Sequence, residues 1–76
     1  MNTMKITFNQ ILKDHRFHQK STHVYRSTVH GGFMEIYKVG RHYILRTEDF
    51  ISHTVNISEY STISELHEAI ITHTSC

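Results

Sequence analysis

The chain has 76 residues, a formal net charge of +1 at pH 7 and 38% hydrophobic residues, which is the composition of one small globular domain. It lacks an apolar run near the roughly 18 residues of a membrane helix, and its N-terminus lacks the apolar segment of a signal peptide. We therefore expect a cytoplasmic protein without membrane contact. The one cysteine, Cys76, excludes an internal disulfide and does not make a zinc site.

The first predicted element is a helix that begins near Phe8 and ends at Arg16 or Phe17. The stretch Thr7–Gln10 fits a capping box, in which the threonine hydroxyl accepts from a backbone N–H three residues on and the glutamine reaches back. Phe8 and Ile11 share one face at helical spacing, so this face is expected to pack on the core.

A polar link over residues 18–22 leads into a segment that two glycine turns divide into three strands. Gly31-Gly32 predicts the first two-residue turn, because glycine accepts the positive φ that such turns need. Gly40-Arg41 predicts the second turn, with glycine in the first position. The segment is therefore expected to form an antiparallel meander.

These two turns fix a strand register. The first pairs Val29 with Met34, and the second pairs Ile36 with Leu45. Both registers place the same side chains on one face, which we expect to be the core face: Tyr25, Val29, Met34, Ile36, Tyr43 and Leu45.

The opposite face of this meander is predicted to be mixed in character. There Glu35 falls opposite Arg46 and near Arg26, which are favourable cross-strand charge pairs. The full predicted face is Val24, Arg26, Thr28, Glu35, Tyr37, Val39, His42, Ile44 and Arg46.

Residues 50–57 alternate between apolar and polar side chains, which predicts a half-buried strand. This is either a fourth strand or an extension of the third. A two-residue turn at Glu48-Asp49 would put Ile51 beside Arg46 on the polar face. We expect a bulge or a longer loop to correct this placement.

The last predicted element is a helix over Ile63–His73. Thr62–Glu65 is a second capping box, and acidic residues near the helix start suit its dipole. Residues 1–76 are therefore expected to form a single α+β domain with the element order α-β-β-β-(β)-α. The sheet would have three or four antiparallel strands.

The charge is divided along the chain. Residues 1–47 hold all eight lysines and arginines against Asp14 and Glu35, which gives +6. Residues 48–76 hold five acidic residues and no lysine or arginine, which gives −5. Either folding interleaves the two halves, or the protein has a basic and an acidic side. The second case would favour a charged partner or a homodimer.

Eight histidines are an unusual number for this length, and His15 and His18 have helical spacing. A zinc site needs three or four ligands, and no spacing of His, Cys or Asp completes one. No nucleophile elbow, catalytic triad order or phosphate loop is present either. We therefore expect no catalytic residues, no metal and no cofactor, and we predict that the chain is not an enzyme.

Nucleic-acid binding is the alternative function. It would use a basic surface made by Lys13, Arg16, Lys20 and Arg26. The α-β-β-β-α order resembles that of the double-stranded-RNA-binding domain and of the HicA-like toxins built on it. The resemblance implies RNA binding. However, the second helix begins with Ser64-Glu65 where that domain carries lysines, and His30-Gly31 reverses the glycine–histidine order of the HicA-like proteins.

Binding to another protein is the function that we favour from the sequence. Aromatic and apolar anchors ringed by arginine suit a protein interface. In size and element order the chain also resembles small phage-encoded inhibitors such as anti-CRISPR proteins, which implies steric blocking of a partner. The partner would be a larger complex, for example one that processes nucleic acid. The predicted partner-binding residues are Arg26, Tyr37, His42, Ile44 and Arg46.

Overall fold

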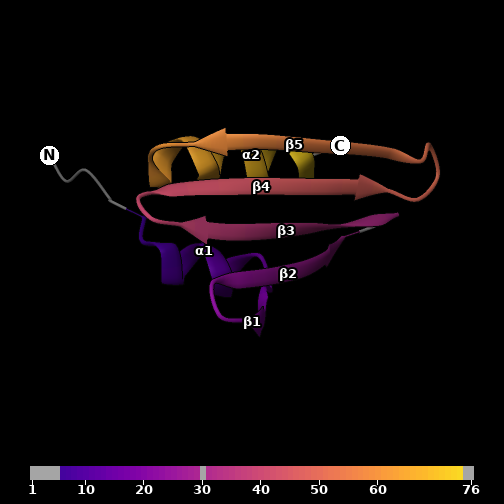
Figure 1. Ribbon diagram of the computed structural model, residues 1–76. Coiled ribbons are helices and arrows are strands. Elements are labelled where there is room, and N and C mark those ends of the chain that lie inside the picture. Colours follow the sequence, from indigo (N-terminus) through magenta and orange to yellow (C-terminus); the bar gives the residue numbers. More distant parts are fainter. Residues whose placement is uncertain (1–5, 30, 75–76) are drawn as a thin grey trace, which may run out of the picture.

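The structure is a computed structural model that describes residues 6–29 and 31–74. Five antiparallel strands form one open sheet in chain order, and both helices lie behind the same face of it (Figure 1). This confirms the predicted α+β fold with its N-terminal and C-terminal helices. The elements are α1 (Phe8–Asp14), β1 (His18–Ser21), β2 (Val24–Val29), β3 (Gly32–Val39), β4 (His42–Asp49), β5 (Thr54–Tyr60) and α2 (Ile63–Thr74).

Helix α1 begins as the sequence predicts and ends earlier. The Thr7 hydroxyl accepts a hydrogen bond from the Gln10 backbone N–H at 3.1 Å. The Gln10 side chain does not reach back to the cap, and instead donates to Asp14. Arg16 has a φ of 58°, which ends the helical path and turns Phe17 into the core.

Residues 18–21 form strand β1 and not the expected polar link. The backbone of β1 pairs with β2, for example His18 with Arg26, although all four of its side chains are exposed. The register shifts between Gln19 and Ser21, which is a bulge in a short edge strand. Because none of its side chains is buried, hydrophobic alternation gave no signal for this strand.

The second turn is confirmed, and the first lies one residue earlier than predicted, which shifts the strand pairing by two residues. Ile36 pairs with Leu45 as predicted, and Gly40 has a φ of 59°. In the first hairpin Val29 pairs with Gly32 and not with Met34. A Cβ atom at Gly32 would overlap the Glu48 carbonyl oxygen, so this glycine serves close packing inside the sheet and not the turn. The turn itself includes His30, which lies outside the described residues.

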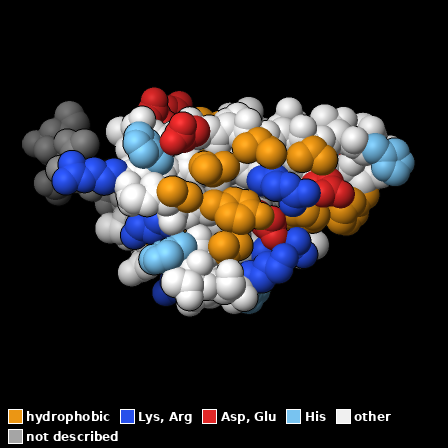
Figure 2. Space-filling model, viewed as in Figure 1, with side chains coloured by type: hydrophobic (Ala, Val, Ile, Leu, Met, Phe, Trp, Pro, Cys, Tyr) orange, Lys and Arg blue, Asp and Glu red, His pale blue; other side chains and the backbone are white. Residues whose placement is uncertain are grey.

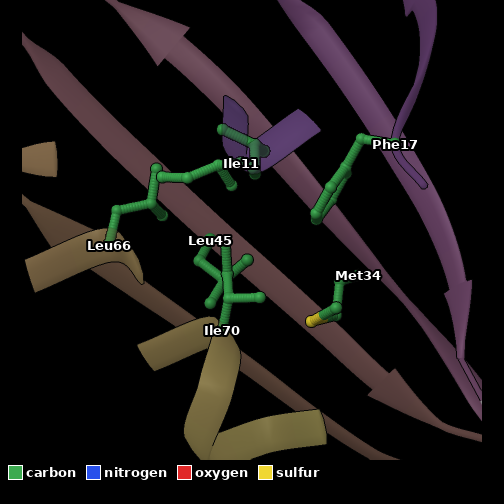
Figure 3. Close-up of a cluster of buried hydrophobic side chains, with 7 residues drawn as sticks. Ile11, Phe17, Met34, Leu45, Leu66 and Ile70 are labelled. Atoms are coloured by element: carbon green, nitrogen blue, oxygen red, sulfur yellow. The ribbon is translucent and has the colours of Figure 1, made fainter. Parts of the chain in front are cut away.

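A shift of two residues keeps every side chain on its predicted face, since side chains alternate along a strand. Met34, Ile36 and Leu45 are therefore buried where the sequence predicts, with Tyr25 and Tyr43 packed partly against them. The side chain of Val29 lies outside the described set. Figure 3 shows how the helices complete this core, whose buried members are Ile11, Phe17, Met34, Ile36, Leu45, Leu66 and Ile70.

Strand β5 is separate, and its apolar side chains point the other way from the expectation. The loop of residues 50–53 is longer than a two-residue turn, and Asp49 closes it by accepting from the backbone N–H groups of Ile51 and Ser52. Val55 then pairs with Glu48 and Ile57 with Arg46, on the face away from the helices. The longer loop does not bring the apolar side of β5 to the core, and the strand is exposed instead of half-buried.

Candidate functional site

The sheet face turned away from both helices is the candidate site, and we call it the open face. Strand register and alternation place on it three cross-strand rows of side chains. They are Val24–Tyr37–Ile44–Glu59, Arg26–Glu35–Arg46–Ile57 and Thr28–Phe33–Glu48–Val55. Figure 2 views this face and shows apolar side chains gathered over the sheet beside basic and acidic ones.

A buried carboxylate, Glu35, is the centre of the open face. Only 2% of it is exposed, although neither helix of the described residues covers it. Its Oε2 atom accepts from Arg26 Nη2 at 2.7 Å and from Lys20 Nζ at 3.2 Å. Its Oε1 atom accepts from the Tyr37 hydroxyl at 2.6 Å and from Arg46 at 3.3 Å. Both carboxylate oxygens are thus fully engaged by donors.

These donors keep Glu35 ionised. Burial on its own raises the pKa of Glu35, but the hydrogen bonds from Tyr37, Lys20 and Arg26 outweigh it and lower the pKa to about 2. The same contact raises the pKa of Tyr37, because its hydroxyl donates to Glu35 and would lose that bond on ionising. A general base must accept a proton near neutral pH, and this carboxylate does not.

Phe33 is a part of this face that the sequence reasoning missed. The guanidinium of Arg26 lies 4.3 Å from the centre of its ring, and that of Arg46 lies 5.2 Å from it. Both are cation–π contacts, and they leave Phe33 9% exposed. Its position two residues before Glu35 in an alternating strand was the available signal. Lys20 was missed as a member of the face because β1 was not predicted.

Each arginine is therefore held from two sides. Arg46 also donates to Glu48 at 3.1 Å, so its guanidinium bridges two carboxylates and lies against an aromatic ring. Arg26 donates to Glu35 and stacks on the same ring. Side chains fixed in this way lose little conformational entropy when a partner binds. We call this hydrogen-bonded centre of the open face the platform, and its members are Lys20, Arg26, Phe33, Glu35, Tyr37 and Arg46.

An apolar strip borders this platform on the β5 side. Ile57 is 65% exposed and Val55 48% exposed, next to Arg46 and Glu48 in the register. Ile44 extends the strip toward Tyr37. Phe50 and Ile51, in the loop before β5, are also exposed. Large apolar side chains grouped on a surface mark interaction sites in soluble proteins.

The structure brings all five predicted partner-binding residues onto the open face. Arg26, Tyr37 and Arg46 surround Glu35, and Ile44 pairs with Tyr37 across the strands. His42 lies farther along β4, with its Nδ1 atom 3.7 Å from a Glu59 carboxylate oxygen. The sequence reasoning did not include the apolar strip of β5, because it assigned that side of the strand to the core.

The predicted basic surface is divided by the fold. Lys13 and Arg16 are exposed on the last turn of α1 and just beyond it. Lys20 and Arg26 lie on the open face, where Glu35 binds both. Half of the basic side chains of this surface are therefore partly neutralised within the protein.

The charge division along the chain is also a division in space. The sheet order follows the chain order, so α1, β1, β2 and β3 lie toward one side and β5 with α2 toward the other. Of the two alternatives that the sequence leaves open, this order favours a basic side and an acidic side. A meander keeps sequence neighbours adjacent, so the two halves lie largely apart and meet at β4 and β5, where Arg46 donates to Glu48 and His42 lies near Glu59.

The described residues contain no group of three or more His, Cys, Asp or Glu side chains that could hold a metal ion. Within the same part of the chain, no helix is long and apolar enough to cross a membrane. Comparison with protein-family models, with curated proteins and with solved structures returns no significant match to this chain. A functional proposal therefore depends on the open face itself.

Proposed function

We propose that this chain is a non-enzymatic protein-binding module whose open face docks on a larger partner and blocks or recruits it. The observation that carries the proposal is the exposed apolar strip of Val55 and Ile57 beside the platform around Glu35. An apolar contact area next to fixed aromatic and arginine side chains is the composition of a protein interface.

The two parts of the face have different roles in this proposal. The strip supplies area whose removal from water favours binding, at about 25 cal/mol per Å². The platform supplies orientation, since Arg26 and Arg46 are fixed against the Phe33 ring and share the Glu35 carboxylate with the Tyr37 hydroxyl. Tyrosine and arginine are the residue types most enriched among side chains that dominate binding energies.

Partner capture with matched isoleucine variants tests the proposal. The variant Ile57→Lys puts a charge into the strip, and Ile71→Lys makes the same change at an exposed isoleucine of α2, away from the open face. We expect Ile57→Lys to weaken capture of a stoichiometric protein from a bacterial lysate by at least about tenfold, and Ile71→Lys to leave it unchanged.

Two results would contradict the proposal. One is recovery of RNA alone with no stoichiometric protein. The other is equal capture by both variants and the wild type, which would mean that the open face is not the interface. Circular dichroism of each variant separates lost binding from lost folding.

Nucleic-acid binding is a second candidate, favoured by the separation of charge in space. It would use Lys13 and Arg16, together with the positive charge of Lys20 and Arg26 that Glu35 does not neutralise. Binding dominated by phosphate falls steeply with salt, because each neutralised phosphate releases counterions. Loss of binding in a Lys13→Ala/Arg16→Ala variant, with full binding retained in Ile57→Lys, would favour this candidate over the first.

Two finer features of the proposal remain predictions from the sequence, and only the first of them comes from the resemblance. They are a steric-blocking mode like that of small phage-encoded inhibitors, and a cytoplasmic location. Identification of the captured protein tests both, since a phage inhibitor would capture a component of a cytoplasmic bacterial complex.

A further inference from the structure

The two edge strands of the sheet differ in how they are protected. Strand β1 has four residues, a bulge and a lysine, which are features that discourage pairing with another strand. Strand β5 has seven residues, TVNISEY, and pairs with β4 without a register shift. Its only charged residue is Glu59, and it contains no proline. The outer edge of β5 is thus long, regular and open to strand addition.

Carboxylates of α2, the helix behind β5, make the surroundings of this edge negatively charged. One flank of α2 faces α1, where the rings of His67 and His15 lie 5.8 Å apart. The opposite flank meets the end of β5, where Tyr60 joins Glu65, Glu68 and further α2 residues around a shallow surface hollow. Residues 48–76 contain no lysine or arginine to offset these carboxylates.

We propose that the outer edge of β5 binds an extended segment of the partner protein as a sixth strand, in which apolar side chains alternate with lysine or arginine. The inference rests on the proposed function and names the partner's chemistry. Main-chain hydrogen bonds along β5 supply the pairing, and the two sides of the added strand meet different surfaces.

Alternation along the added strand explains the required pattern. Every second side chain would lie on the open face and extend the apolar strip of Val55 and Ile57. The intervening side chains would lie on the helix side, beside the carboxylates of Glu65 and Glu68. A strand with acidic residues at those positions would meet like charge, which discriminates against it.

Hydrogen exchange with three capped peptides of about eight residues, the length of a typical strand, tests this inference. The first alternates valine and isoleucine with lysine, the second has glutamate in place of lysine, and the third has the composition of the first in block order. We expect the first alone to slow amide exchange in residues 54–60. No slowing up to about 1 mM peptide, equal slowing by the glutamate peptide, or slowing confined to another segment would overturn the inference.

Charge reversal supplies the matched control. Glu68→Lys should weaken binding of the lysine peptide by about three- to tenfold and allow the glutamate peptide to bind. Asp14→Lys makes the same charge change on α1, which lies by β2 and β3, toward the other edge of the sheet from β5 (Figure 1), and should alter neither. Equal effects of the two variants would mean that net charge, and not the β5 edge, determines binding.

The outcomes separate this inference from the proposed function. Loss of partner capture in Ile57→Lys, together with no response of β5 to any peptide, would leave the open-face interface standing and overturn strand addition. Protection of β5 without peptide, in a species that sediments as a dimer, would show that a second copy occupies the edge and would also overturn it.

Discussion

Two neighbouring residues of β3, Glu35 and Ile36, are almost equally buried for opposite reasons. Ile36 points to the helices and has no exposed surface, inside a cluster completed by Ile11, Leu66 and Ile70. Glu35 points to the open face and is 2% exposed, under arginine, lysine and tyrosine side chains from its own sheet. The two helices cover one face of the sheet, and on the open face only side chains of the sheet itself bury Glu35.

The difference explains why the open face can carry a site. A helix that packs on a sheet buries a whole face, since the hydrophobic effect is non-directional and scales with the buried area. Long polar side chains bury only the group to which they bind, and this burial depends on hydrogen-bond geometry. The remainder of the open face, including Val55 and Ile57, therefore stays exposed and available to a partner.

The largest expected effect comes from a matched pair of isoleucine truncations on the two faces. Ile36→Ala should lower the free energy of unfolding by about 2–4 kcal/mol, because it removes buried methyl groups and leaves a cavity. Ile57→Ala, on the open face, should change it by no more than about 0.5 kcal/mol. Urea unfolding of both variants measures the difference. Similar losses would mean that β5 is buried in solution, and would break the comparison of faces.

The next largest effect is a loss of stability at low pH that arises from Glu35 on the open face. The pKa of Glu35 is about 2 in the folded protein against 4.5 as its ordinary value, so its contribution to stability is present above pH 4.5. It is lost as the pH falls from 4.5 toward 2. We expect a loss on the order of 2 kcal/mol, since Lys20 and Arg26 are partly exposed and water screens their charges.

Glu35→Gln is the control for this acid dependence. The amide keeps the shape of the side chain and removes its charge, so the variant should be less stable at neutral pH and lose this dependence between pH 4.5 and 2. Urea unfolding at several pH values compares it with the wild type. An unchanged acid profile in the variant would show that other carboxyl groups cause the loss.

The sequence predicted those features of the two sheet faces that depend on turn geometry and strand alternation. The turn at Gly40 and the pairing of Glu35 with Arg46 follow from glycine geometry and strand alternation, and both are confirmed. The first hairpin was misplaced because Gly31 and Gly32 look alike in sequence. Only tertiary contact shows that Gly32 must admit the Glu48 carbonyl.

The remaining errors have a common physical origin. Strand β1 is held by backbone pairing and has no buried side chain to reveal it. Strand β5 has the alternation of a half-buried strand, and that pattern does not say which side of the sheet the helices occupy. Part of the candidate site was therefore predictable, namely Arg26, Tyr37 and Arg46 around Glu35, whereas Lys20 and Phe33 were not. The apolar strip of Val55 and Ile57 was not.

The smallest expected effect tests how the platform is held together. The sequence places Tyr37 on the mixed face, outside the predicted core, but its hydroxyl donates at 2.6 Å to the buried Glu35 carboxylate. Tyr37→Phe keeps the ring and removes this bond, and we expect it to lower the free energy of unfolding by about 1 kcal/mol.

In a Glu35→Gln background the same change should cost measurably less, because the charged acceptor is already gone. A double-mutant cycle by urea unfolding gives the coupling, which should be about 0.5–1 kcal/mol. A coupling of zero would mean that Tyr37 stands on the open face independently of Glu35, and that the platform is not a connected unit.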